Sequence, residues 1–138
     1  MKFSLRALTA LLVAVLAAAP VLAQNGSPLS ERDKVGYMLG QDVARAIGPG
    51  LPDLDLASFQ QTIELVMAGG QPTLDAEEAK RLSEALMLNI GARKAGKPLV
   101  ALDRAKAGTL AGTNIGRSLA GFRGEFDMPM FMRGLKDG

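Results

Sequence analysis

Serine and carboxylate side chains are the first candidates for chemistry in this sequence, because it contains no histidine and no cysteine. Ser58 and Ser83 therefore lack a histidine partner, which excludes a histidine-based nucleophile triad. Glu77 and Glu78 are adjacent, but adjacent side chains diverge on a helix, and acidic residues at a helix start are favoured by the macrodipole. The pattern indicates no catalytic residues.

Metal and cofactor ligands are not indicated either. Without histidine and cysteine, the usual zinc and copper ligand sets are missing, and disulfides are excluded. Asp53, Asp55 and Glu64 do not follow the ligand spacing of a calcium-binding EF-hand loop. We expect no metal and no cofactor.

Three methionines lie close together near the end of the sequence: Met128, Met130 and Met132. Methionine side chains are flexible and polarisable, which suits varied apolar contacts. Met130 and Met132 do not share a helix face with Phe131 and Leu135, so we expect some of the three to be exposed and to bind client proteins. The alternative is that they fill the core.

Apolar residues at helical spacing predict the helices that position these side chains. Candidate capping residues precede these runs, and Gly or Pro follows several of them. The expected capping positions are Ser30, Asp55, Asp75 and Asp103. After the N-terminal leader no segment alternates as a β-strand does. We predict an all-α, extended assembly of about five helices.

Small residues recur at every fourth position on two of these helices. The two stripes are Gly36, Gly40 and Ala44 in the first helix, and Gly108, Gly112 and Gly116 in the fourth. Glycine inside a helix costs about 0.5–1 kcal/mol relative to alanine. Small residues at this spacing form a groove in which another backbone approaches closely. The stripes therefore predict tight helix crossings, and the charged residues around them exclude a bilayer setting.

The two stripes occupy equivalent positions of an internal repeat. Lys34–Ile47 aligns without a gap with Lys106–Leu119, 72 residues later, and the same offset places Phe59 on Phe131. The second copy lacks the third helix of the first. We divide the chain into a signal peptide (residues 1–23), a leader (24–30), a first copy (31–97) and a partial second copy (98–138).

The stripes fit either a dimer or a contact within one chain. We expect Phe59 and Phe131 to pack against the opposite copy around the stripes. The stiff third helix between the copies favours exchange between two chains, so we predict an intertwined homodimer, with a pseudo-dimer inside one chain as the alternative. Leucine at Gly40 or Gly112 is expected to force the helices apart, and alanine to be tolerated better.

The first 23 residues predict export. Lys2 and Arg6 precede an uncharged apolar run and a small-residue cleavage pattern that ends at Ala23. No cysteine follows, so no lipid anchor is expected. Removal of this segment leaves 14 basic against 14 acidic residues, from 16 and 14 in the whole chain. A neutral mature chain does not favour nucleic-acid binding, and we expect a periplasmic or otherwise exported protein that is not held in a membrane.

The order of motifs across three helices matches a known pattern. The first helix carries Lys34, Tyr37, Gly40, Asp42 and Ala44, the second Asp55, Phe59 and Gly69-Gly70, and the third opens with Leu74–Leu82. In this order the chain resembles the N-terminal domain of Mip-like, FKBP-type peptidyl-prolyl isomerases of bacterial periplasms. The resemblance covers Asp33 to about Arg93 and again the residues from Arg104 onward. It implies a helical domain that intertwines two chains and holds unfolded clients, while a separate β-rich domain isomerises proline.

The chain departs from that family in its missing catalytic features. It contains no tryptophan, and Tyr37 is its single tyrosine, so the aromatic pocket that the resemblance implies is absent from this sequence. We predict a dimerising, client-holding module in protein folding without isomerase activity of its own. The alternatives are the N-terminal part of an active isomerase whose catalytic domain is missing from this chain, and a structural periplasmic adaptor.

Overall fold

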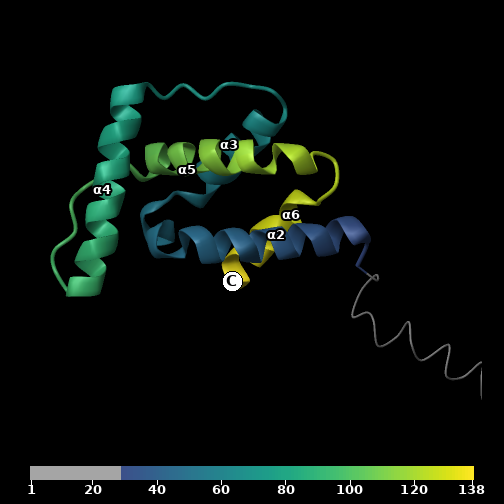
Figure 1. Cartoon of the computed structure of the whole chain (residues 1–138), viewed down its shortest axis with the longest axis horizontal. Coiled ribbons are helices and arrows are strands. Elements are labelled where there is room, and N and C mark those ends of the chain that lie inside the picture. Colours follow the sequence, from purple (N-terminus) through teal and green to yellow (C-terminus); the bar gives the residue numbers. More distant parts are fainter. Residues whose placement is uncertain (1–28) are drawn as a thin grey trace, which may run out of the picture. The chain divides into compact units, whose positions relative to one another are not determined.

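A computed structural model describes residues 29–138, and residues 31–138 form one compact unit (Figure 1). The predicted signal peptide lies outside the described residues. The described part contains no strand, which confirms the all-α class. Its elements are α2 (Glu31–Ile47), the 3-10 helix η1 (Gly48–Asp53), α3 (Leu56–Met67), α4 (Ala76–Ala95), α5 (Arg104–Leu119), the 3-10 helix η2 (Ala120–Phe122) and α6 (Met128–Asp137). None of the helices described is long and apolar enough to span a membrane.

Aspartate side chains begin four of the five α-helices. Asp55, Asp75, Asp103 and Asp127 each accept a hydrogen bond from the backbone N–H three residues later, at 2.7–3.1 Å. Such a bond satisfies one of the N–H groups that a helix start leaves without an intrahelical partner. At the end of α4, Gly96 has a φ of +67°, a left-handed conformation that glycine adopts without strain. The caps at Asp55, Asp75 and Asp103 and the glycine that ends α4 agree with the sequence-based predictions.

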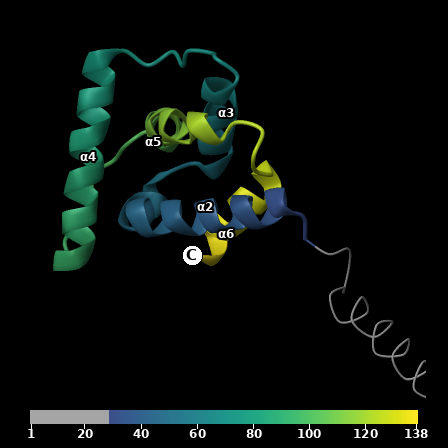
Figure 2. The same cartoon turned by 45° about the vertical axis from the view of Figure 1, so that its right-hand side comes forward.

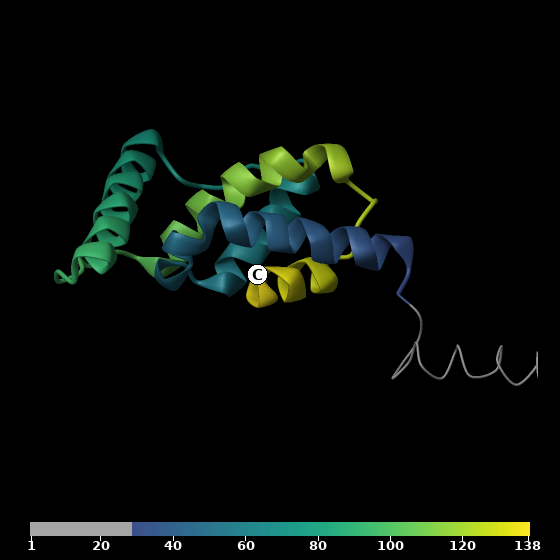
Figure 3. The same cartoon turned by 60° about the horizontal axis from the view of Figure 1, so that its bottom comes forward.

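The helices of residues 31–97 pair with those of residues 98–138. Helix α2 packs against α6, and α3 packs against α5. Figures 1 and 3 show α6 alongside α2, and Figure 2 shows α5 next to α3. Each pair therefore joins one helix from residues 31–97 to one helix from residues 98–138.

The core lies where these pairs meet. Phe59 and Phe131 are both 0% exposed, as is Ile63, and Leu135, which lies 72 residues after Ile63, is 2% exposed. Burying one such phenylalanine contributes about 1.5–3 kcal/mol by transfer from water. The expectation that Phe59 and Phe131 are core residues of the two copies is confirmed.

Of the five α-helices, α4 packs least against the others. Its main contacts are with η1 and α5, and it lies across the end of the paired helices in Figures 1 and 2. Of its residues, Leu82 and Asn89 are buried. Few apolar contacts therefore hold α4 against the remaining helices.

Candidate functional site

The α2–α6 crossing brings two backbones into direct contact at the first glycine stripe. A Cβ added to Gly36 would lie 2.6 Å from the carbonyl oxygen of Asp127 and 3.3 Å from the backbone nitrogen of Phe131. A Cβ added to Gly40 would lie 2.7 Å from the backbone nitrogen of Leu135 and closer still to the carbonyl oxygen of Phe131. Glycine is therefore required here by close approach rather than by backbone conformation.

The α3–α5 crossing makes the corresponding contacts. A Cβ on Gly108 would lie 2.6 Å from the carbonyl oxygen of Asp55 and 3.2 Å from the backbone nitrogen of Phe59. A Cβ on Gly112 would lie 2.7 Å from the carbonyl oxygen of Phe59. All four positions are 72 residues from their equivalents in the α2–α6 crossing.

Backbone hydrogen bonds close the start of each crossing in the same way. The Asp55 N–H donates to the Arg104 carbonyl at 3.0 Å, and the Asp127 N–H donates to the Arg32 carbonyl at 3.2 Å. The guanidinium groups of Arg104 and Arg32 each donate, at 3.3 Å, to the carbonyl of the residue before that aspartate. Equivalent residues therefore form the same hydrogen bonds at the start of both crossings.

At the third position of each stripe, the two crossings differ in which of the facing residues is the larger. Gly116 faces Val66, whose Cβ would lie 2.9 Å from a Cβ added to the glycine. At the equivalent place Ala44 already carries a Cβ, and its partner is Gly138. A larger residue on one helix is therefore matched by a glycine on the other.

Both stripes are filled by helices of the same chain in this structure. The pseudo-dimer contacts that we gave as the alternative are present, so one chain makes both crossings by itself. The intertwined homodimer stays a prediction. That alanine is tolerated better than leucine stays a prediction, although at Gly40 even the added methyl group of alanine would meet the backbone of Phe131 and Leu135 rather than flexible side chains.

The structure separates the three methionines that we expected to bind clients. Met132 is 6% exposed and belongs to the core, so its assignment to a client-binding surface is wrong. Met128 is half-buried against that core, and Met130 is also half-buried. These methionines are buried or half-buried because α6 packs against α2. The contact covers a larger part of α6 than the face that carries Phe131 and Leu135.

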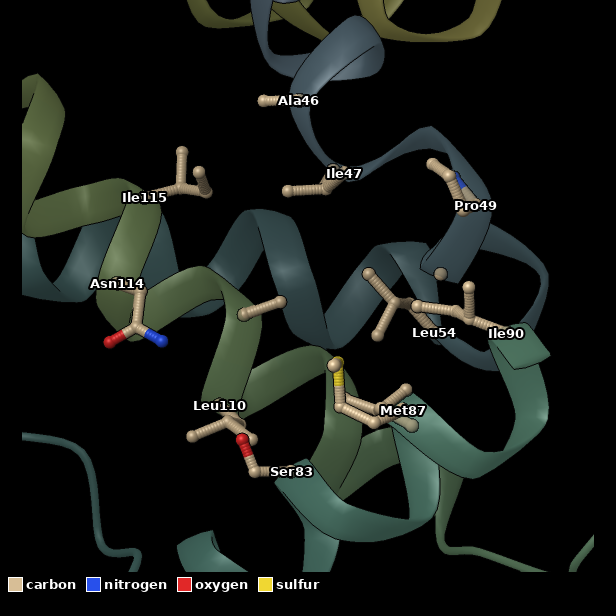
Figure 4. A pocket seen from close by; sticks show the side chains of 13 residues that line it. Ala46, Ile47, Pro49, Leu54, Ser83, Met87, Ile90, Leu110, Asn114 and Ile115 are labelled. Carbon is tan, nitrogen blue, oxygen red and sulfur yellow. The ribbon is translucent and has the colours of Figure 1, made fainter.

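A different apolar surface is open to solvent, in a cleft of about 330 Å³ between α4 and the helices that it contacts. Figure 4 shows side chains of α2, α4 and α5 converging on this cleft. The apolar lining residues are Ala46, Ile47, Pro49, Leu54, Leu86, Met87, Ile90, Leu110, Ala111 and Ile115. Its polar side chains are Ser83 and Asn114, and none of its lining side chains is charged.

The edge of the cleft is formed by exposed apolar residues of α4. Met87 is 71% exposed and Leu88 is 62% exposed. Met87 lines the cleft, and Met87 and Leu88 together line two shallower hollows along α4. The cleft therefore continues into an apolar surface along this helix, and sequence analysis did not single it out.

A buried polar cluster fixes the C-terminal half of α4. Arg93 forms an ion pair with Asp53 of η1, and its guanidinium also donates to the Pro49 carbonyl at 3.2 Å. Asn89, 1% exposed, donates to the Val100 carbonyl at 3.0 Å and accepts from the Val100 N–H at 2.7 Å. Since a buried ion pair carries a desolvation cost, we infer that this cluster sets the position of α4 more than it adds stability.

The N-terminal half of α4 is fixed by a second ion pair. Lys106 of α5 contacts Glu78 at 2.7 Å. The hydrogen bond to the Glu78 carboxylate, with the attraction between the charges, raises the pKa of Lys106. Sequence analysis treated Glu78 only as a helix-start residue, because its partner lies 28 residues later on another helix.

Other polar contacts of the described residues are local. At the start of α3, hydrogen bonds from the Ser58 hydroxyl and N–H lower the pKa of Asp55. Tyr37 donates to Asp137 at 2.9 Å, and this hydrogen bond raises the pKa of Tyr37. Within residues 29–138 no group of acidic side chains is arranged to hold a metal ion.

Comparison with known proteins does not assign the chain to a family. No family model, no curated protein and no solved structure matches it. The two crossings and the apolar cleft are therefore the features on which an assignment of function has to rest.

Proposed function

We propose that this chain is an exported, non-catalytic module that holds unfolded or partly folded client proteins. It is similar in motif order to the N-terminal domain of FKBP-type peptidyl-prolyl isomerases. The observation that carries the proposal is the open apolar cleft between α4 and α5, with Met87 at its edge. An uncharged, apolar surface of this kind selects for exposed hydrophobic side chains, which unfolded chains present and folded chains bury.

The composition of the cleft suits weakly specific binding. Methionine adapts its shape to different apolar partners, and Met87 and Leu88 stand at the place where a client segment would enter. The volume of about 330 Å³ lies at the small end of ligand pockets. A few apolar side chains of a client would fill it, while the adjoining hollows extend the contact along α4.

The pairing of helices supports the family resemblance. That resemblance implies that the helices of two chains interlock, and here the first helix of each copy packs against the second helix of the other. Here α2 contacts α6 and α3 contacts α5, with glycines at matching positions. We propose that a single chain supplies both halves of the assembly, and that further association into a homodimer is not needed to complete the crossings.

Suppression of aggregation tests the client-holding function. The protein is added to an unrelated enzyme that unfolds on warming, and light scattering is recorded. We expect the wild type to reduce scattering in proportion to its concentration. Met87→Glu is expected to remove most of this effect, because a charge at the cleft edge opposes the burial of apolar side chains.

Met38→Glu is the matched control. Met38 is also exposed, at 62%, but lies outside the cleft, so this variant should hold clients as well as the wild type does. Circular dichroism establishes that both variants are folded. The proposal fails if the wild type does not reduce scattering, or if the two variants lose the effect equally.

A further inference from the structure

Helix α4 covers only one of two equivalent helix faces. Its residues Ser83, Leu86 and Met87 lie across the cleft from Leu110 of α5, which is half-buried. The equivalent of Leu110 on α2 is Met38, 72 residues earlier, and it is 62% exposed. The described residues include no second helix of the α4 type to cover this side.

The two ion pairs that hold α4 have counterparts on the uncovered side. Lys106, which binds Glu78, is equivalent to Lys34, whose contact is Glu31 of its own helix at 3.4 Å. Asp53, which binds Arg93, is equivalent to Glu125. Glu125 is exposed and forms no ion pair within residues 29–138. The uncovered side therefore presents the same charges at the same two positions.

The position that Ile90 of α4 approaches is glycine in the first copy and phenylalanine in the second. Ile90 of α4 approaches Gly50, where its Cδ1 would be 3.6 Å from an added Cβ. The equivalent of Gly50 is Phe122, which is 40% exposed. The open seat, defined as Lys34, Met38, Phe122 and Glu125, thus combines two exposed apolar side chains with a positive and a negative charge.

We propose that the open seat binds an amphipathic helix of a partner protein. The partner helix has the chemistry of α4, with an acidic residue near its start, an arginine or lysine near its end, and large apolar residues every fourth position between them. In α4 these roles belong to Glu78, to Arg93 and to Leu82, Leu86 and Ile90. Both charges also complement the helix dipole, so the partner's direction is set by the charges of the seat.

A second copy of this chain is not the occupant that the contacts favour. Its α4 is already held by its own Lys106 and Asp53. Moving α4 to a neighbour's open seat would leave an equivalent seat uncovered, with no gain in contacts. The proposal does not depend on the client-holding function, because none of the residues of the open seat lines the cleft and the seat takes a folded helix rather than an unfolded segment.

A peptide with the sequence of residues 75–97 is a direct probe of the open seat. Labelled peptide is titrated with the full chain, and binding is followed by fluorescence anisotropy. We expect saturable binding that Met38→Glu and Glu125→Arg each weaken about tenfold or more, as expected for loss of an apolar contact and of a charge pair. Met87→Glu is the control and should leave the affinity unchanged.

Reversing the charges of Arg93 in the peptide and Glu125 in the chain tests whether these two side chains pair in the complex. A peptide with Arg93→Glu should bind the wild-type chain about tenfold more weakly, and Glu125→Arg in the chain should restore its affinity. A purely structural effect of Glu125→Arg would weaken both peptides. Because the substituted side chains of the open seat are exposed, the variants should remain folded, which circular dichroism checks.

Three results would overturn the proposal. The first is the absence of saturable binding by the peptide. The second is binding that Lys106→Glu abolishes and Lys34→Glu does not, because the peptide would then be replacing α4 on α5. The third is a concentration-dependent dimer of the full chain that Met38→Glu dissociates, which would assign the open seat to a second copy.

Discussion

The α2–α6 and α3–α5 crossings use equivalent positions but differ in the residues at some of them. In α2–α6, glycine is present on both helices, since Gly40 lies on α2 and Gly134 on α6. A Cβ on Gly134 would lie 2.9 Å from the Tyr37 carbonyl carbon and closer to its oxygen. In α3–α5, the equivalent of Gly134 is Thr62, whose Cβ would be 2.8 Å from a Cβ added to Gly112. The first crossing is therefore closer than the second.

The sizes of the facing residues also differ at the third position of each stripe. Gly138 lies opposite Ala44, while Val66 lies opposite Gly116. If α2 packed instead against α3 of another chain, Ala44 would meet Val66 and Gly40 would meet Thr62. The Ala44–Val66 contact would be more crowded than the observed Gly116–Val66 contact, whereas Gly40–Thr62 would resemble the observed Gly112–Thr62 contact. The sizes of these residues favour the pairing within one chain.

Alanine scanning of the glycines should give the largest difference between the crossings. We expect Gly40→Ala to lower the free energy of unfolding by about 3 kcal/mol, because its methyl group meets backbone on two sides. Gly112→Ala should cost less, about 2 kcal/mol, since the closest backbone atom to its added Cβ, the Phe59 carbonyl oxygen, lies at 2.7 Å and is farther away than the closest backbone atom at Gly40. Urea denaturation measures both values.

Gly91→Ala is the matched control for these two variants. Gly91 lies in the middle of α4, and nothing lies within 4 Å of an added Cβ. The substitution should stabilise the chain by about 0.5–1 kcal/mol through helix propensity alone. Equal losses for Gly40→Ala and Gly112→Ala would show that the two crossings are equally close.

A double-mutant cycle should reveal the compensation at the third stripe position. Gly116→Ala brings a methyl group against Val66, and Val66→Gly removes the obstructing side chain. We expect the double variant to be more stable than the sum of the single effects by about 1 kcal/mol. Leu65→Ala combined with Gly116→Ala is the control, because Leu65 is 44% exposed and is not among the nearest neighbours of Gly116. Additivity in both cycles would contradict the compensation.

The smallest expected difference concerns the caps of α3 and α6. Asp55 accepts from both the N–H and the hydroxyl of Ser58, at 3.1 and 2.7 Å, whereas the equivalent partner of Asp127 is Met130, which offers only its N–H. The Ser58 bonds lower the pKa of Asp55. A lowered pKa in the folded state contributes stability that is present above the ordinary value of 3.8 and is lost as the pH falls through the folded pKa.

Removal of the hydroxyl tests this contribution. Ser58→Ala should raise the pKa of Asp55 toward its ordinary value, as followed by NMR titration of the carboxyl group. The variant should also lose less stability than the wild type between neutral pH and the acid range. Thr109→Ala removes a hydroxyl that bonds within α5 and serves as the control. An unchanged Asp55 titration would show that the hydroxyl does not contribute.

The sequence by itself determined the local structure of this chain. Aspartate caps, apolar spacing and terminating glycines depend on a few neighbouring residues, so Asp55, Asp75 and Asp103 were correctly predicted as helix starts. The glycine stripes also predicted close backbone contact, because no other property of a helix interior favours glycine at that spacing. Phe59 and Phe131 followed as core residues from their equivalent places in the two copies.

Only the tertiary structure decided which helices meet. A glycine stripe accepts any helix that approaches it, so its sequence does not distinguish α6 of the same chain from a helix of another. The positions of α4, Met132 and the ion pairs of Asp53 and Glu78 likewise depend on residues far apart in the sequence. Such contacts form only in the folded chain, and the local periodicity of the sequence does not specify which distant residues meet.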